Sequence, residues 1–214
     1  MFEKHKAKKA EKAYEVQLKT WQDEHDELSS VLQAATTGHG YESSDLILKQ
    51  DESIFGTIAK AGLIEERRGP GHYTGGSAGV SIPIGSVGGR SVRYRVGATR
   101  GTYVQGAPHP EAVDQGVLVL TNQRAVFVGA NKTLECDYPK LVNATVGNGE
   151  LALSVSNRQT VTRVHYGPQL DEWVHLRLTL ALSVYRGDTN EFAAQIQDQL
   201  NELDAKRPVS PVSS

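Results

Sequence analysis

A glycine-rich segment in the middle of the chain restricts the fold more than any other feature. Residues 69–89 read GPGHYTGGSAGVSIPIGSVGG and include eight glycines. Glycine in a helix interior is less favourable than alanine by about 1 kcal/mol per residue, so this segment cannot be helical. Short strands and tight turns accommodate such a composition. We therefore expect β-structure here, with a strand over residues 80–84 between the glycine clusters.

Alternating apolar and polar residues extend the β-prediction along the chain. In a strand over 91–96, Val92, Tyr94 and Val96 would share one face, and Arg93 and Arg95 the other. Turn signals recur about every 8–15 residues, which indicates a small antiparallel barrel or sandwich. The other expected strands cover 53–66 (as one strand, or as a strand pair divided at 61–62), 101–105, 116–120, 125–129, 151–155 and 161–166.

The first 38 residues predict an amphipathic helix, because they contain no proline and no glycine before Gly38. Apolar residues recur there at steps of three or four, with one histidine among them, and so form one stripe. Two interpretations stay open: the helix packs against its own domain, or it forms a homo-oligomer or binds another partner. The stripe consists of Tyr14, Leu18, Trp21, His25, Leu28 and Leu32, and all of these except His25 would form an oligomer contact.

Two more helices are expected towards the C-terminus. Residues 170–185 are apolar around most of a helix surface, which indicates a helix buried against the sheet. A second helix is expected over 188–205, where Asp188 and Glu191 have the spacing of a capping box. The polar tail over 206–214 contains two prolines and is expected to be disordered.

Composition excludes two broad classes of protein. The chain has 23 basic and 25 acidic residues, a net charge of −2. It is therefore neither a generally basic nucleic-acid coat nor a highly acidic disordered chain, and no specific nucleic-acid partner is expected. The single cysteine, Cys136, excludes an internal disulfide and a cysteine-based zinc site.

Arginine is concentrated in residues 67–110. Guanidinium groups suit phosphates and carboxylates, and glycine turns expose amides that hold anions. We therefore interpret this part as a candidate anion-binding site. The alternative is that these arginines pair with residues 21–52, which hold eight acids and one lysine, Lys49. Residues 67–110 contain no lysine, aspartate or glutamate and six arginines: Arg67, Arg68, Arg90, Arg93, Arg95 and Arg100.

No catalytic motif stands out. The seven histidines include no HExxH pair, and the glycine-rich segment lacks the Gly-Lys-Ser/Thr ending of a phosphate-binding loop. No GxSxG nucleophile motif is present. We expect no enzyme activity, no metal and no cofactor. An enzyme acting on phosphate esters would need a carboxylate or metal cluster facing the glycine-rich segment.

The sequence also predicts the cell compartment. The lysine-rich N-terminus is not followed by the apolar run of about 7–15 residues that a signal peptide needs. The most apolar stretch, 176–185, is too short to span a bilayer. We therefore expect a cytoplasmic protein without a transmembrane segment. Any membrane association would be peripheral, at the inner face of the membrane.

Residues 114–129, DQGVLVLTNQRAVFVG, resemble the signature hairpin of bacterial pleckstrin-homology-like and GRAM-like domains. Thr121 and Asn122 can hydrogen-bond backbone amides of the turn. Arg124 can bond turn carbonyls or a carboxylate, a structural role that we favour over a ligand-binding one. The wider chain is similar to a family of actinobacterial proteins of no agreed activity, through 67–84, 93–106 and 155–159. The residues that carry the hairpin resemblance are Gly116, Thr121, Asn122, Arg124, Phe127 and Gly129.

This resemblance implies an α+β fold. We expect an N-terminal helix over 1–38, an antiparallel pleckstrin-homology-like β-barrel or curled sheet with its packing helix over 50–187, and a C-terminal helix over 188–205. The resemblance suggests a non-enzymatic interaction module. Its partner would be a protein or an anionic lipid surface, bound through the arginine-rich strand and the glycine-rich loops. The alternative is a structural or assembly protein that oligomerises through its terminal helices.

Overall fold

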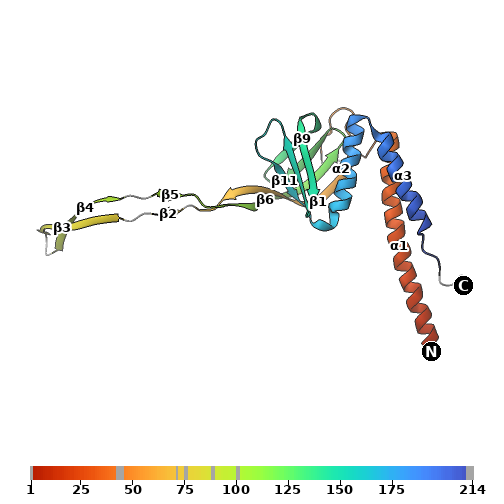
Figure 1. Cartoon of the computed structure of the whole chain (residues 1–214), viewed down its shortest axis with the longest axis horizontal. Coiled ribbons are helices and arrows are strands. Elements are labelled where there is room, and N and C mark those ends of the chain that lie inside the picture. Colours follow the sequence, from red (N-terminus) through yellow and green to blue (C-terminus); the bar gives the residue numbers. More distant parts are fainter. Residues whose placement is uncertain are drawn as a thin grey trace. The chain divides into compact units, whose positions relative to one another are not determined.

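The computed structural model describes residues 2–41, 46–70, 72–74, 77–87, 90–99 and 102–210. The chain is α+β and divides into two compact units, one formed by residues 1–63 and 113–214 and the other by residues 64–112. The sequence-based expectation of one β-domain over 50–187 did not include this division. We refer to the first as the body and to the second as the hairpin unit (Figure 1).

The helices and strands follow a simple order along the chain. Helix α1 (Phe2–Thr37) comes first, and helices α2 (Asp171–Arg186) and α3 (Thr189–Ala205) come last. Two short 3-10 helices cover Tyr138–Lys140 and Pro168–Leu170. The strands between are β1 (Ile54–Arg68), β2 (His72–Thr74), β3 (Ser77–Val87), β4 (Arg90–Thr99), β5 (Thr102–Val104), β6 (Pro108–Thr121), β7 (Arg124–Gly129), β8 (Thr133–Asp137), β9 (Leu141–Gly147), β10 (Glu150–Val155) and β11 (Thr162–His165).

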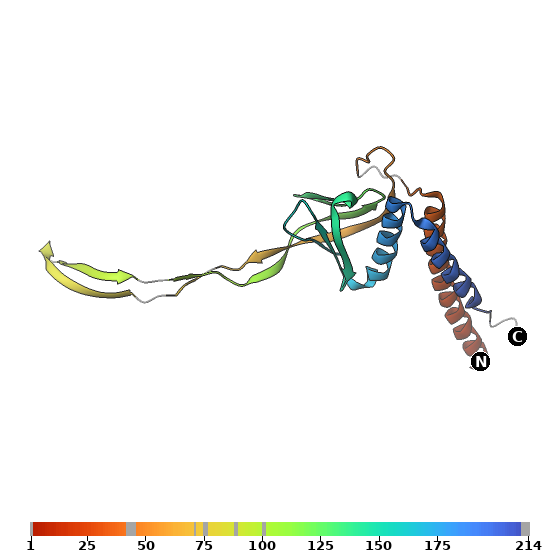
Figure 2. The same ribbon diagram turned by 45° about the horizontal axis from the view of Figure 1, so that its top comes forward.

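Seven strands form one open antiparallel sheet with the order β8-β7-β6-β1-β11-β10-β9. Two antiparallel meanders, β6-β7-β8 and β9-β10-β11, flank β1 on its two sides. Strands β8 and β9 are the two ends of this order. Helix α2 lies beside the strands of the body, and α1 lies beside α3 in both ribbon views (Figures 1 and 2).

The hydrophobic core lies in the body. Strand β10 alternates as expected, with Leu151, Leu153 and Val155 buried and the residues between them half-buried. Helix α2 contributes Val174 and Leu180, which are both fully buried. All residues of the core cluster belong to the body, so the core forms without a described residue of the hairpin unit.

Strand β1 continues through 61–62, so the segment expected as one strand or a strand pair is a single strand. Lys60 takes a positive φ of 60° inside this strand. Ala61 and Leu63, directly after it, are almost fully buried. The burial of these side chains keeps the strand in the sheet despite the glycine between them.

Helix α1 packs against its own chain. The indole Nε1 of Trp21 donates a hydrogen bond of 2.8 Å to the carbonyl oxygen of Leu203. The guanidinium group of Arg207 lies 5.2 Å from the centre of the Trp21 ring. Leu28 belongs to the core cluster, and Leu32 packs against it. From Trp21 onwards, the predicted stripe is therefore occupied within the body.

Helix α3 begins at Thr189, but the expected capping box does not form. The side chain of Asp188 makes no capping hydrogen bond, and its backbone angles are φ −110° and ψ 36°. Such angles differ from the extended backbone of an N-cap residue whose side chain reaches back to the helix amides. Of the tail expected to be disordered, residues 211–214 lie outside the described part of the chain.

The hairpin unit contains two antiparallel strand pairs, β2 with β5 and β3 with β4. The strands expected over 80–84 and 91–96 fall inside β3 and β4, and β5 falls inside 101–105. The register places Val80 opposite Val96 and Ile82 opposite Tyr94. It shifts between Pro83 and Gly85, which is a β-bulge or similar irregularity.

Candidate functional site

The Thr-Asn-x-Arg turn connects β6 to β7 and also binds the segment that precedes β1. The side-chain oxygen of Asn122 accepts a hydrogen bond of 2.9 Å from the amide of Ser53, and its Nδ2 donates one of 2.9 Å to the carbonyl of Asp51. Gln123 Nε2 donates to the carbonyl of Gln50 at 2.8 Å. The turn was expected to bind its own backbone, whereas the structure shows that it also fixes a segment about 70 residues earlier in the chain.

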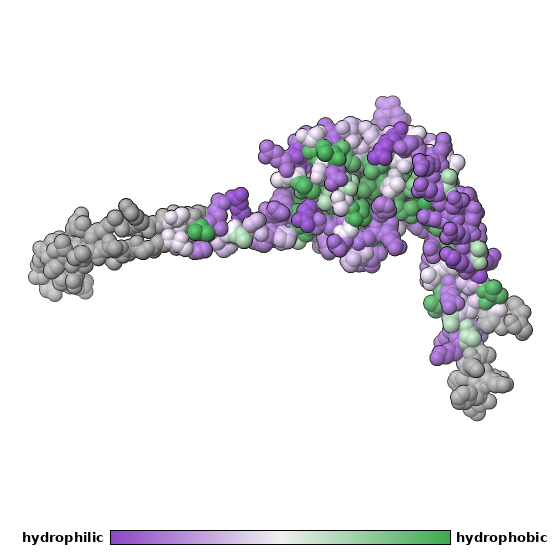
Figure 3. Space-filling view, viewed as in Figure 1, coloured by the Kyte–Doolittle hydropathy of each residue, from purple (hydrophilic) through white to green (hydrophobic). Residues whose placement is uncertain are grey.

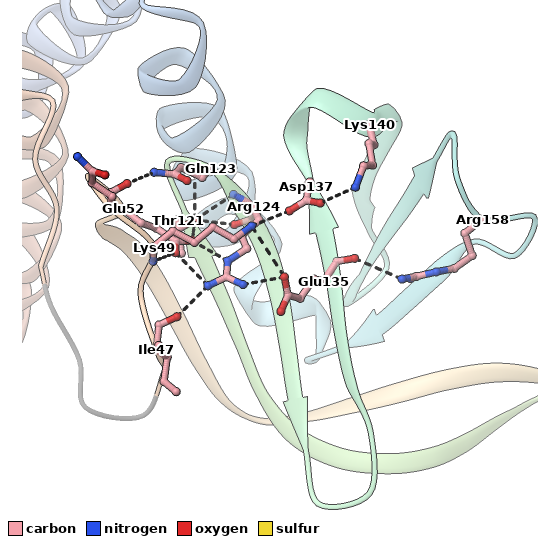
Figure 4. Close-up of polar contacts among 11 residues, drawn as sticks. Ile47, Lys49, Glu52, Thr121, Gln123, Arg124, Glu135, Asp137, Lys140 and Arg158 are labelled. Carbon is pink, nitrogen blue, oxygen red and sulfur yellow. Dashed lines mark hydrogen bonds and ion pairs between the residues drawn. The ribbon is translucent and has the colours of Figure 1, made fainter.

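Arg124 and Glu52 form a buried ion pair behind this turn (Figure 4). Arg124 Nε lies 2.8 Å from Glu52 Oε1, and Arg124 Nη2 lies 2.9 Å from Oε2. The hydroxyl of Thr121 donates to Glu52 Oε1 at 2.7 Å. The Glu52 side chain has no exposed surface, and that of Arg124 is 5% exposed. Because the burial is nearly complete, each charge needs the other to offset the free-energy cost of its removal from water.

The two terminal nitrogens of the Arg124 guanidinium group make further contacts. Nη1 lies 2.7 Å from Glu135 Oε2, and Nη2 donates to the carbonyl of Ile47 at 2.9 Å. Arg124 therefore holds β7, β8 and the segment before β1 together. This geometry supports the structural role predicted for Arg124, and it identifies Glu52 as the carboxylate partner.

Electrostatics keep both groups charged. Burial disfavours the charged form of Glu52, but hydrogen bonds from the Arg124 side chain, the Lys49 amide and the Thr121 hydroxyl outweigh it and lower its pKa. The hydrogen bond to Glu52 is the main cause that raises the pKa of Arg124. Neither group changes its charge near neutral pH, so the pair suits structural support and does not suit proton transfer.

A second, more exposed network continues from this pair along β8. Asp137 lies 3.0 Å from the ammonium groups of both Lys140 and Lys49. The hydrogen bond from Lys140, followed by that from Lys49, lowers the pKa of Asp137. Arg158 donates to Thr162 Oγ1 at 2.8 Å and to the carbonyl of Glu135 at 3.3 Å. The side chains in this network are partly exposed, so each pair contributes little to stability.

The candidate anion-binding arginines all fall within residues 64–112 of the sequence, and five of the six belong to described parts of the hairpin unit. Arg67 pairs with Glu111 at 3.7 Å, and Arg68 donates to the side chain of Gln105. The strand positions of Arg90, Arg93 and Arg95 in β4 are described without their side chains, and Arg100 lies outside the described residues.

The alternative was that these arginines pair with the acids of residues 21–52. Two of those acids pair instead with arginines of the body. Glu52 pairs with Arg124, and Glu27 pairs with Arg177 at 2.7 Å. The partners found for Arg67 and Arg68 belong to the hairpin unit itself. Sequence reasoning missed Glu111, because it stands one residue beyond the acid-free stretch.

The described residues also bear on metal binding and on membrane spanning. No group of three or more histidine, cysteine, aspartate or glutamate side chains there could hold a metal ion. Cys136 is a buried free thiol. None of the described helices has the length and apolar character needed to cross a bilayer. Comparisons with protein-family models, with curated proteins and with solved structures each found no match to the chain.

Proposed function

We propose that this chain is a non-enzymatic interaction module, in which a pleckstrin-homology-like body carries a basic β-hairpin that binds an anionic membrane surface. The strand order supports the pleckstrin-homology-like part of the proposal. Two antiparallel meanders that flank the first strand, followed by a helix that covers the sheet, are the arrangement expected of such a domain. The division of residues 64–112 into a separate unit is what the proposal needs for a binding element.

The register of β3 and β4 is the observation that carries the proposal. Residues directly opposite each other in an antiparallel pair share one face. Val80, Ile82, Tyr94 and Val96 therefore belong to one face of the hairpin. Ser81 is opposite Arg95 and Pro83 is opposite Arg93, so the two arginines belong to the other face. The hairpin is thus amphipathic in its backbone register.

An isolated two-stranded hairpin is marginally stable in water, because it has no second layer to cover its apolar face. A membrane interface provides this cover. An amphipathic element lies in the interface with its apolar face towards the acyl chains and its basic face among the headgroups. Each arginine near an anionic bilayer contributes about 1 kcal/mol to binding. Replacement of two arginines should therefore weaken the partition coefficient about 30-fold.

Vesicle co-sedimentation tests the proposal. The intact chain should sediment with vesicles that contain phosphatidylserine and remain soluble with vesicles of phosphatidylcholine alone. Binding should decrease as salt rises from about 0.05 M to about 1 M, because the screening length falls several-fold over that range. Arg93→Gln/Arg95→Gln should weaken binding about 30-fold, while the matched control Lys60→Gln/Arg186→Gln in the body should leave it unchanged. No binding by the intact chain, or equal binding by both variants, would contradict the proposal.

A further inference from the structure

We infer that a groove bounded by α1, α2 and α3 binds the lysine-rich first half of α1 from a second copy, so that the chain forms an antiparallel homodimer. This surface belongs entirely to the body. It therefore does not depend on what the hairpin unit binds. It shares only Leu28 with the stripe that begins at Tyr14, and from Trp21 onwards that stripe packs against the chain itself.

The groove has an apolar floor and an acidic rim. Its volume is about 660 Å³. Apolar residues are visible between the hydrophilic surfaces of the helices in the space-filling view (Figure 3). The floor is formed by Leu28, Trp173, Leu176, Phe192, Ile196 and Leu203. The rim includes Glu24, Glu27, Glu172 and Glu202, with Lys206 as its one lysine.

Of the four rim carboxylates, two already pair within the chain and two are available to a partner. Glu27 pairs with Arg177, and Glu202 lies 3.9 Å from Lys206. Glu24 and Glu172 make no ion pair among the described residues. An apolar floor between free carboxylates suits an amphipathic helix with a basic side.

The first half of α1 has this chemistry. Residues 1–20 contain six lysines and three glutamates. The described lysines among them, at 8, 9, 12 and 19, are exposed. Basic residues at a helix N-terminus oppose the helix dipole, so nearby acids would stabilise this end of α1. Trp21 contacts Leu203 and Arg207 at the end of α3, so the earlier residues of α1 extend past that helix (Figure 2).

The charge order along α1 is self-complementary. Lys9, Lys12, Val16, Asp23 and Glu27 follow each other at steps of three, four, seven and four, so they lie on one side of the helix. Val16 is 66% exposed. In an antiparallel pair centred near residue 18, Lys12 lies level with Asp23 and Glu24 of the second copy. Lys9 lies level with its Glu27, of which Arg177 contacts only Oε1. Two-fold symmetry forms both contacts twice, which is the condition for a closed dimer.

Sedimentation equilibrium of the full chain tests this inference. We expect a dimer at concentrations of about 1–100 μM, the range of an ordinary reversible interface. Lys9→Glu/Lys12→Glu and Glu24→Lys/Glu172→Lys should each weaken the dimer about tenfold or more, since like charges then face each other. An equimolar mixture of the two variants should restore dimers, and Asp198→Lys, outside the groove on α3, should leave the dimer unchanged.

Three results would overturn it: a monomer throughout this concentration range, a dimer that neither charge reversal weakens, or variants that do not associate when mixed. Circular dichroism of each variant excludes misfolding as the cause of a monomer. The vesicle-binding variant Arg93→Gln/Arg95→Gln should still dimerise, so failure of the dimer and failure of the membrane proposal are distinguishable.

Discussion

The carboxylate of Glu52 and the guanidinium group of Arg124 meet through two hydrogen bonds of 2.8 and 2.9 Å, in a position where both side chains are nearly inaccessible to water. This pair joins the start of β7 to the segment that leads into β1. The turn at 121–124 and the acidic segment are therefore stabilised together, although they are far apart in the sequence.

Removal of one charge of this pair should destabilise the body strongly. Arg124→Met leaves Glu52 buried without its partner, which costs about 3–5 kcal/mol in comparable pairs. Urea unfolding at neutral pH measures the loss. The matched control Asp137→Asn removes a partly exposed carboxylate and should cost about 1 kcal/mol or less. Equal losses of unfolding free energy in the two variants would contradict the claim that the buried pair stabilises the body more than the exposed one does.

The same pair predicts a pH dependence of stability. Glu52 has a lowered pKa in the folded chain, so its contribution is fully present above its unfolded pKa of about 4.3. This contribution is lost as the pH falls through the folded value. The free energy of unfolding of the intact chain should therefore exceed that of the Glu52→Gln variant by the largest margin above about pH 5. Urea titrations of both proteins from pH 7 to about pH 3 should show the gap narrowing, and a gap that widens in acid would contradict this assignment.

Local patterns in the sequence predicted much of the fold. Strict alternation predicted β10. The apolar stripe, together with the absence of proline and glycine before Gly38, predicted α1 to within one residue of each end. The position of β8 was not predicted, because TLECD has no clear alternation. The division between body and hairpin unit depends on which strands contribute to a shared core, and local patterns do not contain that information.

Gly149 lies in the turn between β9 and β10, where the chain approaches the segment that precedes α2. This glycine has a φ of +75°, and a Cβ built on it would lie 2.6–2.8 Å from backbone atoms of Gly167 and Pro168. Gly149→Ala should therefore cost about 2–4 kcal/mol, from the strained backbone and the overpacking together. Thermal or urea unfolding measures this cost.

Gly147 provides the matched control for that change. A Cβ at Gly147 meets nothing within 4 Å. Gly147→Ala should therefore change stability by about 0.5 kcal/mol or less. Comparable losses for the two alanine variants would contradict the close approach at Gly149.

The candidate site could be predicted only in part. Thr121, Asn122 and Arg124 were identified through the resemblance of residues 114–129 to a known signature hairpin. Their partners Ser53, Asp51 and Glu52 were not, because a contact across about 70 residues of chain leaves no local pattern. The acid-free stretch of arginines falls within the hairpin unit, yet Glu111, the counterion of Arg67, stands just outside that stretch.

The role of the hairpin unit is tested most directly by its removal. Gly69 and Ala107 face each other, with the Gly69 amide 3.2 Å from the Ala107 carbonyl, so an Asn-Gly turn can replace residues 70–106. The shortened chain should keep the thermal stability of the body, because the core cluster lies outside the hairpin unit. Co-sedimentation with phosphatidylserine vesicles should then be lost. A folded, shortened chain that still binds these vesicles as the intact chain does would contradict the account.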